Sequence, residues 1–186
     1  MAVLRLPAED STVTDHHAVR AHLARLGIDY ERWDAAPVHS DATPDEILAA
    51  FAEDIDRLKS EGNYTHADVI ELTPDTPGLD EMLDKFKVEH WHDEDEVRYV
   101  ISGRGVFHFA SPAGEVAALE VEAGDLVRVP RGTSHWFDLC HTRQIRAIRL
   151  FEDKTGWRPN YTGSGVDARY AALCLGPSQI PFEGTL

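Results

Sequence analysis

Residues 88–151 restrict the possible fold more than any other part of the sequence. They show no convincing helical period and contain short, strand-like segments divided by turns that hold glycine. Strands are expected at 88–92, 96–102, 105–110, 116–121, 125–129, 134–139 and 144–151. Six or more antiparallel strands in succession are typical of a barrel or a double-sheet jelly roll, which protects its edges by closing. We therefore expect a mainly β fold.

Helical patterns fall in the N-terminal third of the chain. Helices are expected at 15–26, 44–61 and 79–86, with strands at 3–6, 28–33 and 67–72. The clearest helix start is at Thr43, where an N-cap threonine is followed by Pro44 and two acidic residues. We expect a single domain over 1–186, in which a helical part at about 1–87 packs outside a barrel at about 88–152, and a tail at about 153–186 wraps its surface.

The charge and the cysteine content restrict the partners and the compartment. The chain carries 18 Lys and Arg against 33 Asp and Glu, a formal net charge of −15. Nucleic acid and anionic membranes are not expected partners, because phosphate contacts need clustered cations. No run approaches the roughly eighteen apolar residues of a membrane span. Because Cys140 and Cys174 are the only cysteines, no disulfide framework is indicated, and we expect a cytoplasmic protein. Without an obvious large apolar surface stripe, a monomer is favoured.

His90-Trp91-His92 is the first candidate site. In an extended segment the two imidazoles at i and i+2 project from the same face. After the acidic turn 93–95, Glu96 and Arg98 share one face of the next strand. If the two faces are continuous, two imidazoles and one carboxylate converge, which is a metal-ligand pattern. The alternative interpretation of an isolated H-x-H pattern is a polar, solvated strand face.

His135 supplies a fourth candidate ligand, at the start of a strand that follows the turn Pro130-Arg131-Gly132. A single histidine here is more often structural, and it becomes a ligand candidate because the earlier group lacks another donor. Three imidazoles and one carboxylate suit Fe(II), Ni(II), Co(II) or Mn(II) in six-coordinate geometry. Such a set leaves two adjacent positions for a bidentate oxygen ligand.

The two segments resemble the paired cupin motifs G-x5-H-x-H-x3-4-E-x6-G and G-x5-P-x-G-x2-H-x3-N. The matching residues are His90, His92, Glu96 and Gly103 in the first motif, and Gly124, Pro130, Gly132 and His135 in the second. Two positions depart from the motifs, because Asp84 replaces a glycine and Leu139 replaces the asparagine. Neither is a ligand position, so the departures affect loop geometry rather than metal binding. The resemblance implies a cupin-type double-stranded β-helix.

Within the cupins, four segments over 89–161 resemble the acireductone dioxygenases of methionine salvage: EHWHDEDEVRYVISGRG, VPRGTSHWFD, AIRLF and GWRPNY. The resemblance implies one Fe(II) or Ni(II) per chain, bound by the four candidate ligands. The implied substrates are O2 and the acireductone 1,2-dihydroxy-5-(methylthio)pent-1-en-3-one, bound as a dianion. The implied products are formate and 4-methylthio-2-oxobutanoate with iron, or formate, carbon monoxide and 3-methylthiopropanoate with nickel.

The same resemblance gives roles to six further residues. Arg98 would stabilise the substrate anion. Phe86, Phe137 and Trp157 stand where the family places aromatic groups around the substrate, and Glu89 and Asp95 stand where it places supporting acids. The alternatives are core packing for the aromatic residues and solvation for the acids.

A different class of function is also compatible with the sequence. A cupin can bind a metal or small ligand without catalysis, or act as a metal-dependent isomerase, because fold alone does not fix function. Arg98 and GWRPNY favour the dioxygenase, since a passive binder does not need them. His16, His17 and His22 have no carboxylate or cysteine partner spaced to complete a site and are expected on a solvated helix, whereas His108 is expected in a structural role and His141 in an exposed turn.

Overall fold

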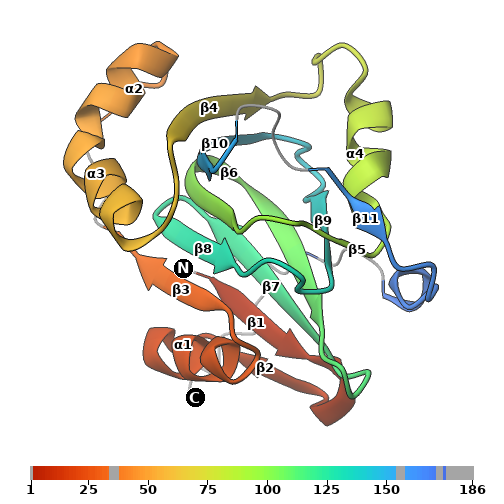
Figure 1. Ribbon diagram of the computed structural model, residues 1–186. Coiled ribbons are helices and arrows are strands. Elements are labelled where there is room, and N and C mark those ends of the chain that lie inside the picture. Colours follow the sequence, from red (N-terminus) through yellow and green to blue (C-terminus); the bar gives the residue numbers. More distant parts are fainter. Residues whose placement is uncertain (1, 34–37, 154–157, 171–173, 175–186) are drawn as a thin grey trace, which may run out of the picture.

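The computed structural model describes residues 2–33, 38–153, 158–170 and 174. Within these residues, eleven strands form one sheet with two wings that share the long strand β6 (Figure 1). The first wing consists, in order, of β11 (Asn160–Tyr161), β5 (His90–Trp91), β9 (His135–Leu139), β6 (Glu96–Ala110), β7 (Val116–Glu122), β1 (Val3–Leu6) and β2 (Ser11–Val13). The second wing consists of β3 (Asp29–Arg32), β8 (Asp125–Val129), β6, β10 (Ile145–Phe151) and β4 (His66–Leu72).

The mainly β expectation is confirmed, but backbone pairing among the described residues does not close the sheet into a barrel. Among the described residues, the first wing ends at β11 and β2, and the second at β3 and β4. The N-terminal third is also less separate than expected. Its strands β1, β3 and β4 pair antiparallel with β7, β8 and β10, so this part of the chain contributes to both wings.

Strand β6 connects the two wings. Its first half pairs with β8 and β10, and its second half, from Arg104 onward, pairs with β7 and β9. The transition occurs at Gly103, which has φ +80°, directly after a register shift against β10. A Cβ at this position would lie 2.7 Å from the Cα of Ile145 and closer still to the Gln144 carbonyl oxygen. The two strands expected at 96–102 and 105–110 are therefore one strand that bends at a glycine.

The helices α1 (His16–Arg25), α2 (Pro44–Ala50), α3 (Ala52–Glu61) and α4 (Leu79–Lys87) lie outside the sheet (Figure 1). The capping box at Thr43 is confirmed, with reciprocal hydrogen bonds between Thr43 and Glu46. The single helix expected over 44–61 is wrong, because it breaks at Phe51 (φ −106°, ψ 19°). The Phe51 ring is buried 4.9 Å from the Tyr99 ring, so tertiary packing overrides the helical pattern there. None of the described helices is long and apolar enough to cross a membrane.

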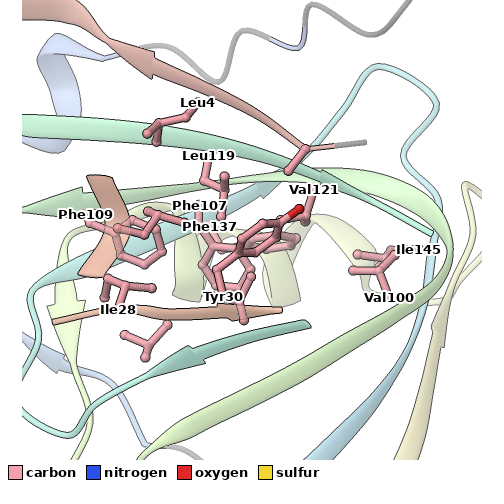
Figure 2. Close-up of a cluster of buried hydrophobic side chains, with 14 of the residues drawn as sticks. Leu4, Ile28, Tyr30, Val100, Phe107, Phe109, Leu119, Val121, Phe137 and Ile145 are labelled. Atoms are coloured by element: carbon pink, nitrogen blue, oxygen red, sulfur yellow. The ribbon is translucent and has the colours of Figure 1, made fainter. Parts of the chain in front are cut away.

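Two clusters of apolar side chains hold these layers together. The larger lies between the wings, and Figure 2 shows its aromatic centre at Tyr30, Phe107, Phe109 and Phe137. The second packs α2 and α3 against the outer face of the second wing and includes Ile47, Phe51, Ile55, Leu58, Val97, Tyr99, Ile148 and Leu150. The inner and outer faces of β6 therefore serve different cores.

The sequence indicates no disulfide framework, and this interpretation is wrong for its two cysteines, because Cys140 and Cys174 are bonded across 34 positions of sequence. Cys140 follows β9, where its buried side chain lies with Val106 and Ala118. The described part of the C-terminal segment also forms β11, places Tyr170 6.3 Å from the Trp136 ring and contains the 3-10 helix Asp167–Arg169. This segment is thus attached to the first wing at several points.

Candidate metal centre

The four candidate ligands lie together at one end of the sheet. His90 is in β5, His92 follows it, Glu96 begins β6 and His135 begins β9, directly opposite His90 in the strand register. All four are buried, with exposed fractions of 1% to 3%. Potential ligand atoms of the three histidines lie within 4.8 Å of one another. The expected period-two arrangement of His90 and His92 is consistent with this convergence.

Each imidazole is oriented by a backbone carbonyl. The Nδ1 atoms of His90, His92 and His135 lie 2.7, 2.9 and 2.8 Å from the carbonyl oxygens of Val88, Arg158 and Thr133. Because a carbonyl oxygen only accepts a hydrogen bond, each Nδ1 carries the proton and donates it. When the rings are neutral, their three Nε2 atoms present lone pairs, the form in which histidine binds metals.

The lone pairs of the Nε2 atoms face those of the Glu96 carboxylate at short distance. Glu96 Oε2 lies 3.1 Å from Nε2 of His135 and 3.4 Å from Nε2 of His92, while Nε2 of His90 is buried and has no hydrogen-bond partner among the described residues. A carboxylate facing neutral Nε2 atoms is unfavourable unless positive charge lies between them. A proton or a metal cation relieves this repulsion, so the residues present fit a divalent metal ion.

The protonation of the histidines reflects the same balance. Burial lowers the pKa of His90 to about 4, and the neighbouring His135 contributes. Burial acts in the same direction on His92, but the Glu96 carboxylate outweighs it and raises the pKa of His92 above its ordinary value. Glu96 thus attracts positive charge to one side of the site.

Arg98 lies next to the candidate ligands, as the shared face with Glu96 predicts. Its guanidinium Nη2 is 2.7 Å from Glu96 Oε1, and its side chain is 11% exposed. Burial alone would raise the pKa of Glu96, but Arg98 and the two imidazoles hold that pKa well below its usual range. The guanidinium carbon also lies over the rings of Phe137 and Phe107, at 4.7 and 5.4 Å from their centroids. The cation is therefore held between a carboxylate and two aromatic faces.

Glu89 has the contacts of a structural support rather than those of a solvated acid. It is 5% exposed and accepts hydrogen bonds from the hydroxyls of Ser134, Thr162 and Ser164. Burial would raise the pKa of Glu89, but these hydroxyls lower it overall. Glu89 thus connects the C-terminal segment to the residue that precedes His135. Thr162 and Ser164 could not be predicted as partners of Glu89 from local patterns, because they are 73 and 75 positions away from it.

Asp95 connects the acidic turn to the loop before His135. Its carboxylate accepts hydrogen bonds from the Tyr64 hydroxyl at 3.1 Å and from the Arg131 backbone amide at 3.0 Å. Asp95 therefore links the turn before Glu96 to the loop before His135 through a hydrogen bond.

The aromatic candidates separate into three cases. Phe86 is half-buried with its ring 5.7 Å from the His90 ring, whereas Phe137 is 5% exposed and contacts Arg98. Trp157 lies outside the described residues. The structure adds two rings that the sequence did not indicate, Phe107 against Arg98 and Tyr161 at 6.4 Å from His90.

The other histidines of the described chain lie outside this group. His108 is buried and stacks on Trp136 at 4.8 Å, which agrees with a structural role. His141 and His17 are exposed as expected. His16 and His22 are partly buried. The His16 ring also lies 5.4 Å from the Tyr30 ring, so His16 is more enclosed than the solvated helix surface that was expected for it.

Three imidazoles and a carboxylate at one end of a two-winged antiparallel sheet define a candidate metal centre in a cupin-type protein. Comparison with known proteins then identifies the family. The model of the ARD/ARD' family matches residues 7–159, and this chain belongs to that family.

Curated relatives and a solved structure agree with this assignment. The acireductone dioxygenase of Picosynechococcus sp. is 38% identical over 176 residues, 94% of this chain and all of the relative. The acireductone dioxygenase of Pseudomonas aeruginosa is 40% identical over 164 residues, 87% of this chain and 89% of the relative. The structure of acireductone dioxygenase from Bacillus anthracis with a cadmium ion in its active centre superposes with a TM-score of 0.82 at 35% identity, covering 87% of this chain and 98% of that one.

Proposed function

We propose that this protein is a metal-dependent dioxygenase that cleaves the acireductone 1,2-dihydroxy-5-(methylthio)pent-1-en-3-one with O2. The observation that carries the proposal is the convergence of three Nε2 atoms and Glu96 beside Arg98, whose side chain is 11% exposed. The curated relatives, which cover most of this chain at about 40% identity, support it further.

The proposed ligands of one Fe(II) or Ni(II) ion per chain are His90, His92, His135 and Glu96. Their nitrogen and oxygen donors suit these borderline cations. When bound, the metal supplies a Lewis acid and a template for two oxygens of the substrate. Under this proposal, iron gives formate and 4-methylthio-2-oxobutanoate, and nickel gives formate, carbon monoxide and 3-methylthiopropanoate.

We propose that Arg98 stabilises the negative charge of the substrate. A guanidinium in a site with little water attracts an enediolate more strongly than it would in bulk solvent, and it lowers the free energy of the anionic form. Phe86, Phe137 and Trp157 are the proposed apolar surroundings of the methylthio end. Glu89 and Asp95 are proposed to keep the ligand-bearing segments in place through their contacts with Ser134 and with the Arg131 amide.

The activity is tested by oxygen uptake with freshly generated acireductone, on protein loaded separately with Fe(II) and Ni(II). We expect metal-dependent uptake in both forms and different products, identified by mass spectrometry. Absence of metal-dependent uptake in both forms would leave a binding protein or an isomerase.

The ligand assignment is tested by measuring metal per chain in His135→Ala, with His141→Ala as the matched control because His141 is exposed in the turn after the same strand. We expect His135→Ala to lose stoichiometric metal while remaining folded, and the control to retain it. Unchanged metal content in His135→Ala would remove it from the ligand set.

The role of Arg98 is tested by Arg98→Ala, with Arg104→Ala as the control on the same strand, where Arg104 pairs with Glu122. We expect Arg98→Ala to keep its metal and to lose about 100-fold or more in turnover, the range seen when a preorganised electrostatic group is removed. Unchanged turnover at saturating substrate would exclude Arg98 from the reaction.

We further propose a cytoplasmic monomer without nucleic-acid partners. Among the described residues, the large apolar side chains classed as exposed are Val88 and Tyr161, which is little apolar surface for a stable dimer. The Cys140–Cys174 bond is the observation that opposes a reducing compartment. Light scattering tests the oligomeric state, and thiol alkylation before cell lysis tests the redox state of the cysteines in the cell.

A further inference from the structure

The inward-facing residues of β6 change from even to odd positions along the strand. Before the bend, Glu96 and Arg98 face the site, and Val100 belongs to the inner cluster, whereas Val97 and Tyr99 belong to the outer cluster. After the bend, Phe107 and Phe109 belong to the inner cluster.

The cause of this change is an irregularity in the pairing with β10. Arg146 pairs with Ser102 but Ala147 pairs with Val100, so one residue of β6 is inserted, and Gly103 follows in a left-handed conformation. In an uninterrupted strand, two residues nine positions apart project to opposite faces. The bulge therefore places Phe107 on the same side as Arg98, which sequence periodicity does not predict.

Phe107 contacts both the guanidinium of Arg98 and the second ring beneath it. Its ring is fully buried, 5.4 Å from the guanidinium carbon of Arg98 and 4.7 Å from the Phe137 ring. Phe107 and Phe137 are also directly opposite each other in the β6–β9 register. The aromatic pair thus forms one continuous surface on which the cation rests.

Phe137 itself is confined from two sides. A Cβ at Gly105 would lie 2.5 Å from Cε2 of Phe137 and closer still to its Cζ, so the ring occupies space that only a glycine leaves. Phe107 bounds the same ring along the strand register. With Glu96 bound to the guanidinium at 2.7 Å, the position of Arg98 depends on a carboxylate and on this pair of rings.

We propose that Phe107 is a positioning residue for Arg98, which it fixes both by direct contact and through the ring of Phe137. The inference rests on the proposed function, because it assigns Phe107 to the same site. Phe107 acts through Arg98 and not on the substrate. Replacing Phe107 should therefore lower the rate of the reaction in the wild-type protein but not in a variant that lacks Arg98.

Phe107→Leu tests the proposal, with Phe109→Leu as the matched control. Phe109 is also buried on β6, and among the described residues its ring contact is with Phe107 at 5.8 Å. We expect Phe107→Leu to lower kcat/KM about tenfold, the loss that follows from weakening one desolvated cation–π contact, while metal per chain stays unchanged. Phe109→Leu is expected to have less than half that effect on a logarithmic scale. Phe107→Met replaces the leucine variant if that variant does not fold, because the unbranched methionine side chain adapts more readily to the space that the ring leaves.

A double-mutant cycle distinguishes positioning from a general loss of packing. In the Arg98→Ala background, Phe107→Leu is expected to cause no further loss of residual turnover, since the residue through which it acts is absent. An equal loss in both backgrounds, or equal losses in the Phe107 and Phe109 variants, would overturn the proposal.

A measurement without turnover separates this inference from the proposed function. Ring currents of Phe107 and Phe137 should displace the NMR signals of the Arg98 side chain, and Phe107→Leu should shift these signals far more than Phe109→Leu does. Lack of oxygen uptake by the wild type would refute the proposed function alone. Unchanged Arg98 signals in Phe107→Leu would refute the positioning role.

Discussion

Gly103→Ala combines two costs whose sum can be worked out from the structure. The first is the left-handed backbone at φ +80°, which costs an alanine about 1–2 kcal/mol. The second is the overlap of the new Cβ with the backbone of Gln144 and Ile145, including a distance of 2.7 Å to the Ile145 Cα. The overlapping atoms belong to the backbone, so no flexible side chain can move away to relieve the contact. Separating β6 from β10 to relieve such overpacking costs about 1–3 kcal/mol more.

We therefore expect Gly103→Ala to lower the free energy of unfolding by about 2–5 kcal/mol, and the middle of that range corresponds to a fall in Tm of about 10 °C for a domain of this size. Separation of β6 from β10 would also weaken the hydrogen bond from the Arg104 amide to the Gln144 carbonyl, which is 3.1 Å long in the native structure. The assay is thermal unfolding of metal-free protein followed by circular dichroism, so that loss of metal does not contribute.

Gly114→Ala is the matched control. Gly114 has φ +84° in the turn between β6 and β7, but no atom of the part of the chain that the structure describes lies within 4 Å of the position that a Cβ would take. Only the backbone cost of about 1–2 kcal/mol applies, so a fall in Tm of a few degrees is expected. Equal destabilisation by the two substitutions would show that the close approach of β6 and β10 does not restrict residue 103.

Two further measurements test the disulfide and the site. Cys174→Ala opens a loop that spans 34 positions, and the chain-entropy model then gives a decrease of up to about 4 kcal/mol in the free energy of unfolding. An unchanged free energy of unfolding, measured with denaturant, would refute this. In metal-free protein, imidazole NMR should find His90 neutral down to a pKa of about 4. Because the unfolded chain takes up that proton near pH 6.5, His90 makes folding less favourable as the pH falls through this window, by about 3 kcal/mol at most. Titration of His90 near 6.5 would contradict its burial as the cause.

The sequence predicted the elements whose pattern is local. The period of two placed His90 and His92 on one face, and it placed Arg98 beside Glu96, where the structure has an ion pair of 2.7 Å. The helix start at Thr43 was predicted from its capping residues for the same reason. These features depend on residues that are neighbours along the chain.

The features that the sequence did not predict depend on distant contacts. The break at Phe51 arises because its ring packs on Tyr99, and the disulfide requires a path of the C-terminal segment that no periodicity indicates. Phe107 was missed because a one-residue bulge moves it to the face of Arg98. In each case a packing or pairing partner far away in sequence decided the local outcome.

The shortness of β5 has a consequence for the dynamics of the site. This strand has two residues, one register pair with β9 and two with β11, so few backbone hydrogen bonds oppose its local opening. A metal ion held by His90 and His92 would bind only the closed form and would stabilise it by mass action. Amide hydrogen exchange at β5 should then be slow in metal-loaded protein and fast in metal-free protein, while the long strand β6 stays protected in both. The exchange rate of the β5 amides would therefore report whether the site holds a metal ion.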